Sequence, residues 1–307
     1  AAVGALTKYC TVLATCHVPL MHPLMVAKMS STIDHVTSGR FALNVVCGWF
    51  QNEFDMFGAE MRPHDDRYKY AAEWLDLLKK AWTEENEFNF DSESFHAKNV
   101  WSQPKPLQKP HPPVMNAGGS PAAQDFTTRY ADMNFIHLKD RGDASGSKKQ
   151  VDQLKHMARS HNRDTRIWIH VYVVCRETEK EANDYLHHYV HEKGDWEAAG
   201  NLLRIFGLQS QTHDQKTLES QKAHFIAGHG GYPLVGTAEQ IVEELCRLAD
   251  IGVDGCLISW VDYKSELIQW NRQVLPLLEQ VGLRRPFAPP APARSEAVAS
   301  AAKIEAS

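Results

Sequence analysis

The sequence predicts an α/β fold built around a parallel β-sheet. Apolar runs of strand length alternate along the chain with amphipathic stretches of helix length, which is the pattern of successive βα units. Residues 167–175 form a continuous apolar run, and such runs are typical of parallel strands that are covered on both faces. The chain has 307 residues, and an α/β barrel of roughly 250 residues would fit within that length as one domain.

The predicted elements follow one another as a βα series. Ser38-Gly39 end the first long helix and Ser120-Pro121 begin a later one, as turn and cap residues do. A proline-rich excursion with one short hairpin is expected over 88–113, a polar loop over 140–148 and an insertion-like loop region over 207–231. We predict strands over 10–15, 40–46, 113–117, 133–138, 167–175 and 255–261, and helices over 23–36, 67–82, 121–130, 179–206, 238–249 and 264–281, with a further helix that ends near residue 160.

Six strands are an awkward number, because a closed barrel of this class needs eight. Residues 1–8 have the character of a helix end, so we expect two βα units to precede Ala1 in the full protein. Residues 1–285 are expected to form this incomplete barrel. From 286 to 307 the chain is rich in Ala and Pro with few large residues, and we expect a disordered tail there.

Composition and charge exclude several classes of protein. With 33 Lys and Arg residues against 38 Asp and Glu residues, the net charge is −5, which excludes an electrostatic nucleic-acid binder. No run approaches the roughly 20 apolar residues that cross a bilayer, so no membrane segment is predicted. The six cysteines are scattered and form no Cys-x-x-Cys pair, which indicates reduced thiols in a cytoplasmic protein and no zinc or disulfide framework.

The run Val114-Met-Asn-Ala-Gly-Gly-Ser-Pro121 has the composition of a strand that leads through a tight turn into a helix. Two glycines let a ligand approach the backbone, Ser120 is a good N-cap, and Pro121 suits the first helical position. The free N–H groups of a helix N-terminus favour a phosphate. A plain βα turn is the alternative, since such caps are common.

Asn44 lies among the apolar residues of a predicted strand and needs hydrogen-bond partners if it is buried. A side chain of another strand or the polar edge of a flat heterocycle would satisfy it. Glu53 follows in the loop after this strand, and loops at the carboxyl ends of barrel strands build active sites. Asp65 and Asp66 stand near a predicted helix start, where the helix dipole alone would explain them.

Four motifs carry a resemblance to a known family. The motifs are, in chain order, Asn44-Val-Val-Cys-Gly-Trp-Phe-Gln-Asn-Glu53, His64-Asp-Asp-Arg-Tyr68, Pro104-Lys-Pro-Leu-Gln-Lys-Pro-His-Pro112 and Asn116-Ala-Gly-Gly-Ser120. With them the sequence resembles the bacterial-luciferase-like flavin monooxygenases. Within that family it is most similar to the alkanesulfonate and dimethyl sulfone monooxygenases, with the pyrimidine oxygenases next. The similarity covers roughly residues 1–283.

The resemblance implies a TIM (β/α)8 barrel of the luciferase-like type whose first two βα units lie before Ala1. It also implies FMN as the cofactor, used as FMNH2 from a separate NAD(P)H-dependent flavin reductase, with O2 as cosubstrate. Some relatives use a deazaflavin, but the motifs favour FMN. Family members are usually dimers or tetramers, so a homo-oligomer is expected. By position, Asn44 would hydrogen-bond the isoalloxazine and Glu53 would belong to the flavin-side loop.

The same resemblance implies which residues would hold the other end of the flavin. Arg67 and Tyr68 would contact the flavin tail, while Ser120 and the backbone of Gly118 and Gly119 would hold the FMN phosphate. This agrees with the helix-terminus interpretation of the same residues.

The residues that would bind the substrate differ from those of the alkanesulfonate enzymes. The alkanesulfonate enzymes carry an Arg in a Gly-rich lid, whereas residues 227–236 of this chain contain no Arg. His229 lies there but lacks the bidentate fork of an arginine, so a neutral sulfone or another small neutral substrate fits better than a sulfonate. By position, His17, His137 and His229 are the candidates for proton delivery, and a purely structural histidine is the alternative for each.

The leading hypothesis is therefore an FMNH2-dependent two-component monooxygenase that acts on a small organosulfur substrate, a sulfone or an alkanesulfonate, with C–S cleavage. A second hypothesis keeps the fold and replaces the substrate with a pyrimidine or another small carbon compound. A third is a flavin-binding fragment without turnover.

Overall fold

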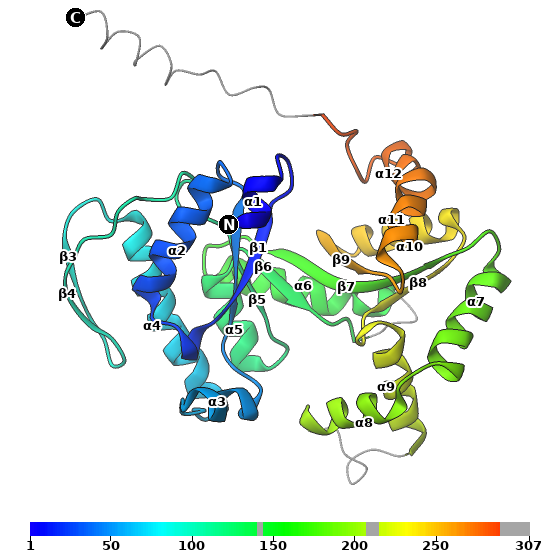
Figure 1. Ribbon diagram of the computed structural model, residues 1–307, viewed down its shortest axis with the longest axis horizontal. Helices are drawn as coiled ribbons and strands as arrows, with labels where there is room; N and C mark the ends of the chain where they lie inside the picture. The colour runs from blue at the N-terminus through cyan, green and yellow to red at the C-terminus, as the bar shows by residue number, and fades with distance from the viewer. Residues whose placement is uncertain (140–143, 207–214, 289–307) are drawn as a thin grey trace, which may run out of the picture.

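A parallel seven-stranded sheet forms the centre of the molecule (Figure 1). The computed structural model describes residues 1–139, 144–206 and 215–288. Neighbouring strands pair in the order β1-β2-β5-β6-β7-β8, and β9 pairs with the other edge of β7. The strands are β1 (Val12–His17), β2 (Phe41–Val46), β5 (Val114–Ala117), β6 (Met133–Ile136), β7 (Arg166–Cys175), β8 (Tyr232–Gly236) and β9 (Gly255–Ser259), while β3 (Phe88–Asp91) and β4 (His96–Val100) form a separate antiparallel hairpin.

Helices follow most of the strands, as expected of βα units. Side-chain caps begin several of them; for example, Ser120 accepts a hydrogen bond from the N–H of Ala123, and Thr178 and Thr237 head capping boxes. The helices are α1 (Ala2–Leu6), α2 (Pro23–Val36), α3 (Gln51–Phe57), α4 (His64–Thr83), α5 (Pro121–Tyr130), α6 (Ala144–Ser160), α7 (Glu179–His187), α8 (Trp196–Ile205), α9 (Gln215–Gly228), α10 (Ala238–Asp250), α11 (Tyr263–Gln269) and α12 (Leu275–Gln280).

The helices cover one face of the sheet with two apolar cores. In the first, Trp74 and Leu78 of α4 pack with Leu43 of β2 and with residues of α2 and α5. In the second, residues of α6, α10 and α12 pack against β7, where Ile167 and Ile169 are almost fully buried. Figure 1 shows the first helix group near the β1–β2 end of the sheet and the second near the β8–β9 end. Burial of such a side chain stabilises the fold by roughly 1.5–3 kcal/mol.

The opposite, inner face of the sheet carries the residues that matter for function. Side chains alternate along each strand, and residues paired in register point to the same face. Thr15 pairs with Asn44, and Tyr172 pairs with Ser259. The inner-face residues given by this register are Leu13, Thr15, His17, Ala42, Asn44, Met115, Met133, Phe135, Trp168, His170, Tyr172, Leu257 and Ser259.

The structure confirms the parallel α/β fold and the hairpin, with several corrections. Residues 144–148 of the predicted polar loop belong to α6, and the helix predicted over 179–206 is interrupted at 193–195. The predicted loop over 207–231 is wrong for most of its length, because its described part is α9. The strand β8 was not predicted; it is short, contains Pro233, and pairs with the carboxyl half of β7. Residues 140–143 of the predicted polar loop and 289–307 of the predicted tail lie outside the described residues. No helix in the described part of the chain is long and apolar enough to cross a membrane.

Candidate functional site

The candidate site residues form two groups at the carboxyl ends of the strands. The first group surrounds β1, β2 and the N-terminus of α5. The second lines a cavity beside β6, β7 and β9. The carboxyl ends of parallel strands are where α/β proteins place their ligands.

A glycine turn forms the floor of the first group. A Cβ on Gly118 would stand 2.4 Å from the Cβ of Ala123, so a side chain there would displace α5. A Cβ on Gly119 would meet nothing within 4 Å, so the backbone of Gly119 faces open space. The Tyr68 hydroxyl lies near Gly118 and Ser120. Burial raises the pKa of Tyr68, while a hydrogen bond with Ser120 acts in the opposite sense. The phenol is therefore a protonated donor beside the helix N-terminus.

Arg67 contacts the turn after β2 and has one nitrogen without a hydrogen bond. Its Nη1 donates to the carbonyl of Gly48 at 2.6 Å. Its Nε is buried and has no hydrogen-bond partner among the described residues. Gly48 itself has a φ of +99°, and a Cβ there would stand 2.4 Å from the ring of Phe54. Gly48 thus allows the turn after β2 that positions Arg67. The Nε–H of Arg67 remains available to a ligand.

Asn44 is also only half satisfied. Its Nδ2 donates to the Thr15 Oγ1 at 3.2 Å, but its Oδ1 is buried without a partner in the described structure. By contrast, Asn116 of the next strand is fully used: it donates to the carbonyl of Val45 at 2.7 Å and accepts from Thr127 at 2.8 Å. Asn116 therefore has a structural role, because it links β5 to β2 and to α5. Asn44 instead presents an unpaired acceptor on the inner face.

His17 and Glu53, which the sequence assigned to different roles, lie together. The Nδ1 of His17 is 2.8 Å from the Oε2 of Glu53, an ion-pair distance without the angles of a hydrogen bond. Glu53 belongs to the first turn of α3, a helix that was not predicted. The two side chains are each 30% exposed, so they stand at the edge of the inner face.

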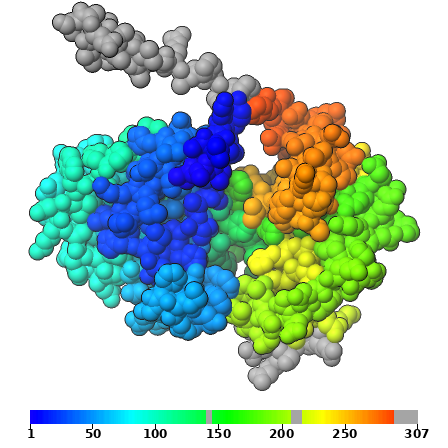
Figure 2. Space-filling view, in the orientation of Figure 1, coloured from blue at the N-terminus to red at the C-terminus, as the bar shows by residue number. Residues whose placement is uncertain are grey.

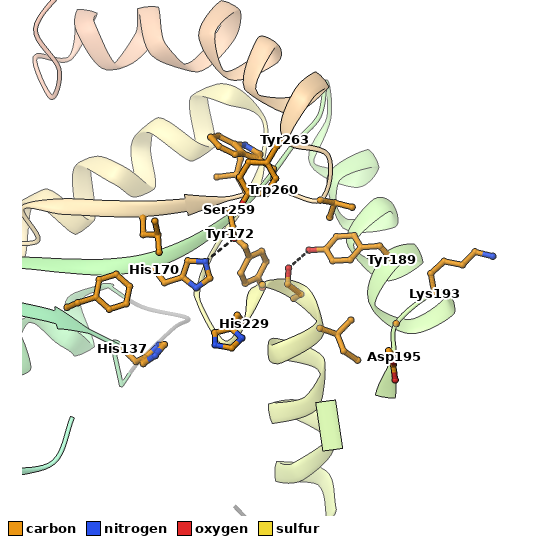
Figure 3. A pocket seen from close by; sticks show the side chains of 18 residues that line it. His137, His170, Tyr172, Tyr189, Lys193, Asp195, His229, Ser259, Trp260 and Tyr263 are labelled. Carbon is orange, nitrogen blue, oxygen red and sulfur yellow. Dashed lines mark hydrogen bonds between the residues drawn. The ribbon is translucent and has the colours of Figure 1, made fainter. Parts of the chain in front are cut away.

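The second group lines a cavity of about 810 Å³ (Figure 3). Apolar walls come from β6, β9 and α9, and the polar groups deeper inside are histidines and a serine. Its lining residues include Phe135, His137, His170, Tyr172, Ile226, His229, Leu257, Ser259, Trp260 and Val261.

Three histidines from three elements meet in this cavity (Figure 3). His137 follows β6, His170 lies on β7 and His229 follows α9. Burial, together with the nearby charges of His229 and His137, lowers the pKa of His170 to about 4. His170 was missed in the sequence, although the alternation of β7 places it on the same face as Trp168 and Tyr172.

His229 occupies an unusual backbone position. Its φ is +50°, in the left-handed region that favours glycine, and its N–H donates to the carbonyl of Phe225 at 2.8 Å. A Cβ on the preceding Gly228 would stand 2.3 Å from Tyr172, so the helix end packs directly on β7. The stretch expected to be a lid is therefore the C-terminus of α9 followed by β8.

Comparison with known proteins identifies the family. The model of the luciferase-like monooxygenases matches residues 1–255. This chain belongs to the luciferase-like monooxygenase family. The luciferase-like monooxygenases include a relative 33% identical over 268 residues, the FMNH2-dependent dimethylsulfone monooxygenase of Pseudomonas putida, in an alignment that covers 86% of this chain and 72% of the relative.

Two other comparisons extend this assignment. The pyrimidine monooxygenase RutA of Acinetobacter baylyi is 28% identical over 284 residues, or 91% of this chain and 75% of the relative. The crystal structure of riboflavin lyase (RcaE), with modified FMN and riboflavin, has a TM-score of 0.82 at 22% identity and covers 94% of this chain and 74% of that one. The expected family and the monooxygenase class are confirmed, and the structural likeness supports the α/β fold with a parallel sheet.

Proposed function

We propose that this luciferase-like monooxygenase uses FMNH2 and O2 to oxygenate a small organosulfur compound, a sulfone or alkanesulfonate, with cleavage of a C–S bond. A separate NAD(P)H-dependent flavin reductase supplies the FMNH2. The observation that carries the proposal is a pair of buried polar atoms near β2 that have no hydrogen bond among the described residues, the Arg67 Nε and the Asn44 Oδ1. Relatives named for FMNH2 and for dimethylsulfone support it.

The first group of residues fits the two ends of FMN. Ser120, the backbone of Gly118 and Gly119, and Tyr68 would hold the phosphate, because they combine a helix N-terminus with an open backbone and a hydroxyl donor. Arg67 would add a charged donor near the tail. No Cβ fills the space before Gly119, as a cradle for an anion requires.

The inner face of β1 and β2 fits the ring. Asn44 would accept a hydrogen bond from an N–H of the isoalloxazine through its unused Oδ1. Glu53 would orient His17 at the edge of this site. Bound reduced FMN would supply the electrons that activate O2.

The cavity beside β7 would receive the substrate. Its apolar walls exclude water from the reacting groups. We propose His137 and His229 in this cavity, and His17 at the edge of the first group, as the groups that exchange protons with the substrate, since each stands at or just after the end of a strand or helix. The imidazole of His170 is held neutral and is a hydrogen-bonding group.

For the fold, we propose residues 1–285 as one domain with the geometry of a (β/α)8 barrel. The outer edges of β1 and β9 pair with no other strand in the described ranges. Leu13 of β1 is 45% exposed and Leu257 of β9 is 55% exposed, although both lie on the inner face. Two further parallel strands between β9 and β1 would cover them and, with β1, β2, β5, β6, β7 and β9, would make eight, while β8 would be an additional strand beside the carboxyl half of β7. We also propose a homo-oligomer in a reducing cytoplasm, where the six free cysteines would stay reduced.

A pyrimidine is the second candidate substrate. The RutA relatives favour it, and the histidines and serine of the cavity could pair with the donors and acceptors of such a ring. The proposal is tested by oxygen consumption in the presence of FMNH2 and a flavin reductase, with dimethyl sulfone and uracil compared at equal concentrations. Oxygen uptake with dimethyl sulfone supports the sulfur substrate, and uptake with uracil alone supports the second candidate. Flavin binding with no substrate-dependent uptake for any compound would favour a protein that binds flavin without turnover.

A further inference from the structure

A hydrogen-bonded pair crosses from β7 to β9 inside the cavity. The Nε2 of His170 and the Oγ of Ser259 are 2.9 Å apart (Figure 3). Ser259 in turn donates to the carbonyl of Val171 at 3.4 Å. If the serine proton is directed to that carbonyl, the serine oxygen accepts from His170, so we assign the hydrogen of the imidazole to Nε2. Neither residue is among those that the sequence singled out.

The packing around His170 holds the ring in this position. Its Nδ1 would stand 3.0 Å from a Cβ on Gly231, so the turn after α9 covers that edge of the ring. The other titratable groups that face it are His137 and His229. Burial and the charges of these two histidines oppose its protonation, and its pKa falls to about 4. At neutral pH the pair therefore brings no charge into the cavity.

The lining of the cavity offers an anion little compensation. Of its described residues, only Lys193 and Asp195 belong to types that are charged at neutral pH, and both are exposed. Asp195 is occupied as the N-cap of α8, and the chain of Lys193 extends away from the histidines (Figure 3). An ionised group that left water for this site would lose hydration without a partner of opposite charge.

Ser259 is well placed to meet a neutral acceptor. Its bond to the Val171 carbonyl is at the long limit of hydrogen bonding, so the hydroxyl can rotate towards a ligand at small cost. The bond from His170 would strengthen the serine as a donor, since hydrogen bonds in a chain polarise one another.

We propose that Ser259 is the specificity-determining donor of the substrate site, that His170 positions it, and that the site takes an uncharged compound with an acceptor oxygen on a small apolar body. The inference rests on the proposed function and narrows its substrate class to sulfones and similar neutral compounds. Leu257, Trp260 and Val261 would contact the apolar part.

A matched pair of ligands tests whether the site prefers a neutral compound to an anion. Dimethyl sulfone and methanesulfonate have nearly the same size. Methanesulfonate carries an anionic oxygen where dimethyl sulfone has its second methyl group. Saturation-transfer NMR detects the methyl protons of either ligand on the full chain and needs no bound flavin. We expect a signal from dimethyl sulfone and a signal at least about tenfold weaker from methanesulfonate. Equal signals, or a stronger one from methanesulfonate, would overturn the inference.

Variants test the pair itself. We expect Ser259→Ala to raise the Kd and the KM for dimethyl sulfone about 5- to 10-fold, the loss of one hydrogen bond, with the affinity for FMN unchanged. His170→Leu should raise the Kd and the KM by a similar factor. His170→Gln should keep most of the affinity, because its amide can donate a hydrogen bond from the place of Nε2. The double variant Ser259→Ala/His170→Leu should bind dimethyl sulfone no more weakly than Ser259→Ala. Ser160→Ala, at the exposed end of α6, is the matched control.

The outcomes separate this inference from the proposed function. If wild type and Ser259→Ala bind dimethyl sulfone equally, or if the effects of the two single changes add in the double variant, the pair does not act as proposed. If the binding pattern holds but no oxygen is consumed with FMNH2, the neutral site is supported and the proposed monooxygenation is contradicted. If uracil shows the same dependence on Ser259 and His170, the neutral class is supported with the second candidate substrate.

Discussion

The indole of Trp49 stacks on the ring of Phe206, with centroids 5.2 Å apart and planes inclined by 25°. This contact joins the loop after β2, beside the candidate flavin site, to the end of α8, and Figure 2 shows the two segments side by side. Phe206 then meets Phe225 at 5.8 Å, and Phe225 meets His229 at 5.4 Å. A continuous row of rings thus connects the loop after β2 with the cavity beside β7.

The Trp49 contact is expected to couple these two regions. Loss of one such aromatic pair costs about 0.5–1.5 kcal/mol beyond area burial. Trp49→Ala should therefore raise the KM for the substrate several-fold and lower Tm by only a few degrees. Trp101→Ala removes another exposed tryptophan, on the hairpin side of the molecule, and is the control. Equal KM values for the two variants would show that the row of rings has no part in substrate binding.

Gly118 and Gly119 should respond differently to the same change. Gly118→Ala would place a methyl group 2.4 Å from Ala123, so we expect a loss of stability as well as of FMN binding. Gly119→Ala meets no atom in the protein and should change the free energy of unfolding by less than about 0.5 kcal/mol. Its methyl group would enter the phosphate space, and FMN affinity should fall at least tenfold. Urea unfolding and flavin titration of both variants measure the contrast; unaltered FMN binding by Gly119→Ala would place the phosphate elsewhere.

The left-handed backbone at His229 predicts a difference between two variants that both remove the imidazole. His229→Gly should be more stable than His229→Ala by about 1 kcal/mol, because glycine adopts a φ of +50° without a steric penalty. The difference is read from urea unfolding at constant pH. Both variants should lose activity similarly if the imidazole exchanges protons with the substrate. Full activity in either one would remove His229 from the mechanism.

The lowered pKa of His170 predicts a pH dependence of stability. Its pKa is about 4 in the folded protein against an ordinary value of 6.5, so between these values the unfolded chain binds more protons. This contribution to stability is fully present above pH 6.5 and is lost as the pH falls towards 4. Allowing for solvent screening, we expect it to be about 1–2 kcal/mol. The difference in unfolding free energy between wild type and His170→Gln should narrow over this range; a constant difference would contradict the burial of a neutral imidazole.

The sequence predicted the local geometry of the first group of residues better than that of the cavity beside β7. Gly118, Gly119 and Ser120 form a local turn whose cap and open backbone follow from residue type, and Asn44 stands out as a polar residue in an apolar strand. His170 lies in an equally apolar strand but makes its contact with Ser259, 89 residues away, which no local pattern reveals. The helix α9 was missed because its apolar residues do not form a clear stripe along one side. The proximity of His17 to Glu53 depends on α3, a short helix within a loop rich in aromatic residues.

An anaerobic fluorescence titration of FMNH2 into the full chain tests the central claim most directly. Arg67→Ala and Ser120→Ala would be titrated beside wild type, with Arg247→Ala as a control that removes an exposed arginine paired to surface glutamates. We predict saturable binding by wild type and Arg247→Ala, and binding at least tenfold weaker in Arg67→Ala and Ser120→Ala. Failure of the folded wild-type chain to bind FMNH2, or equal affinity in all four proteins, would contradict the flavin site described around Gly119.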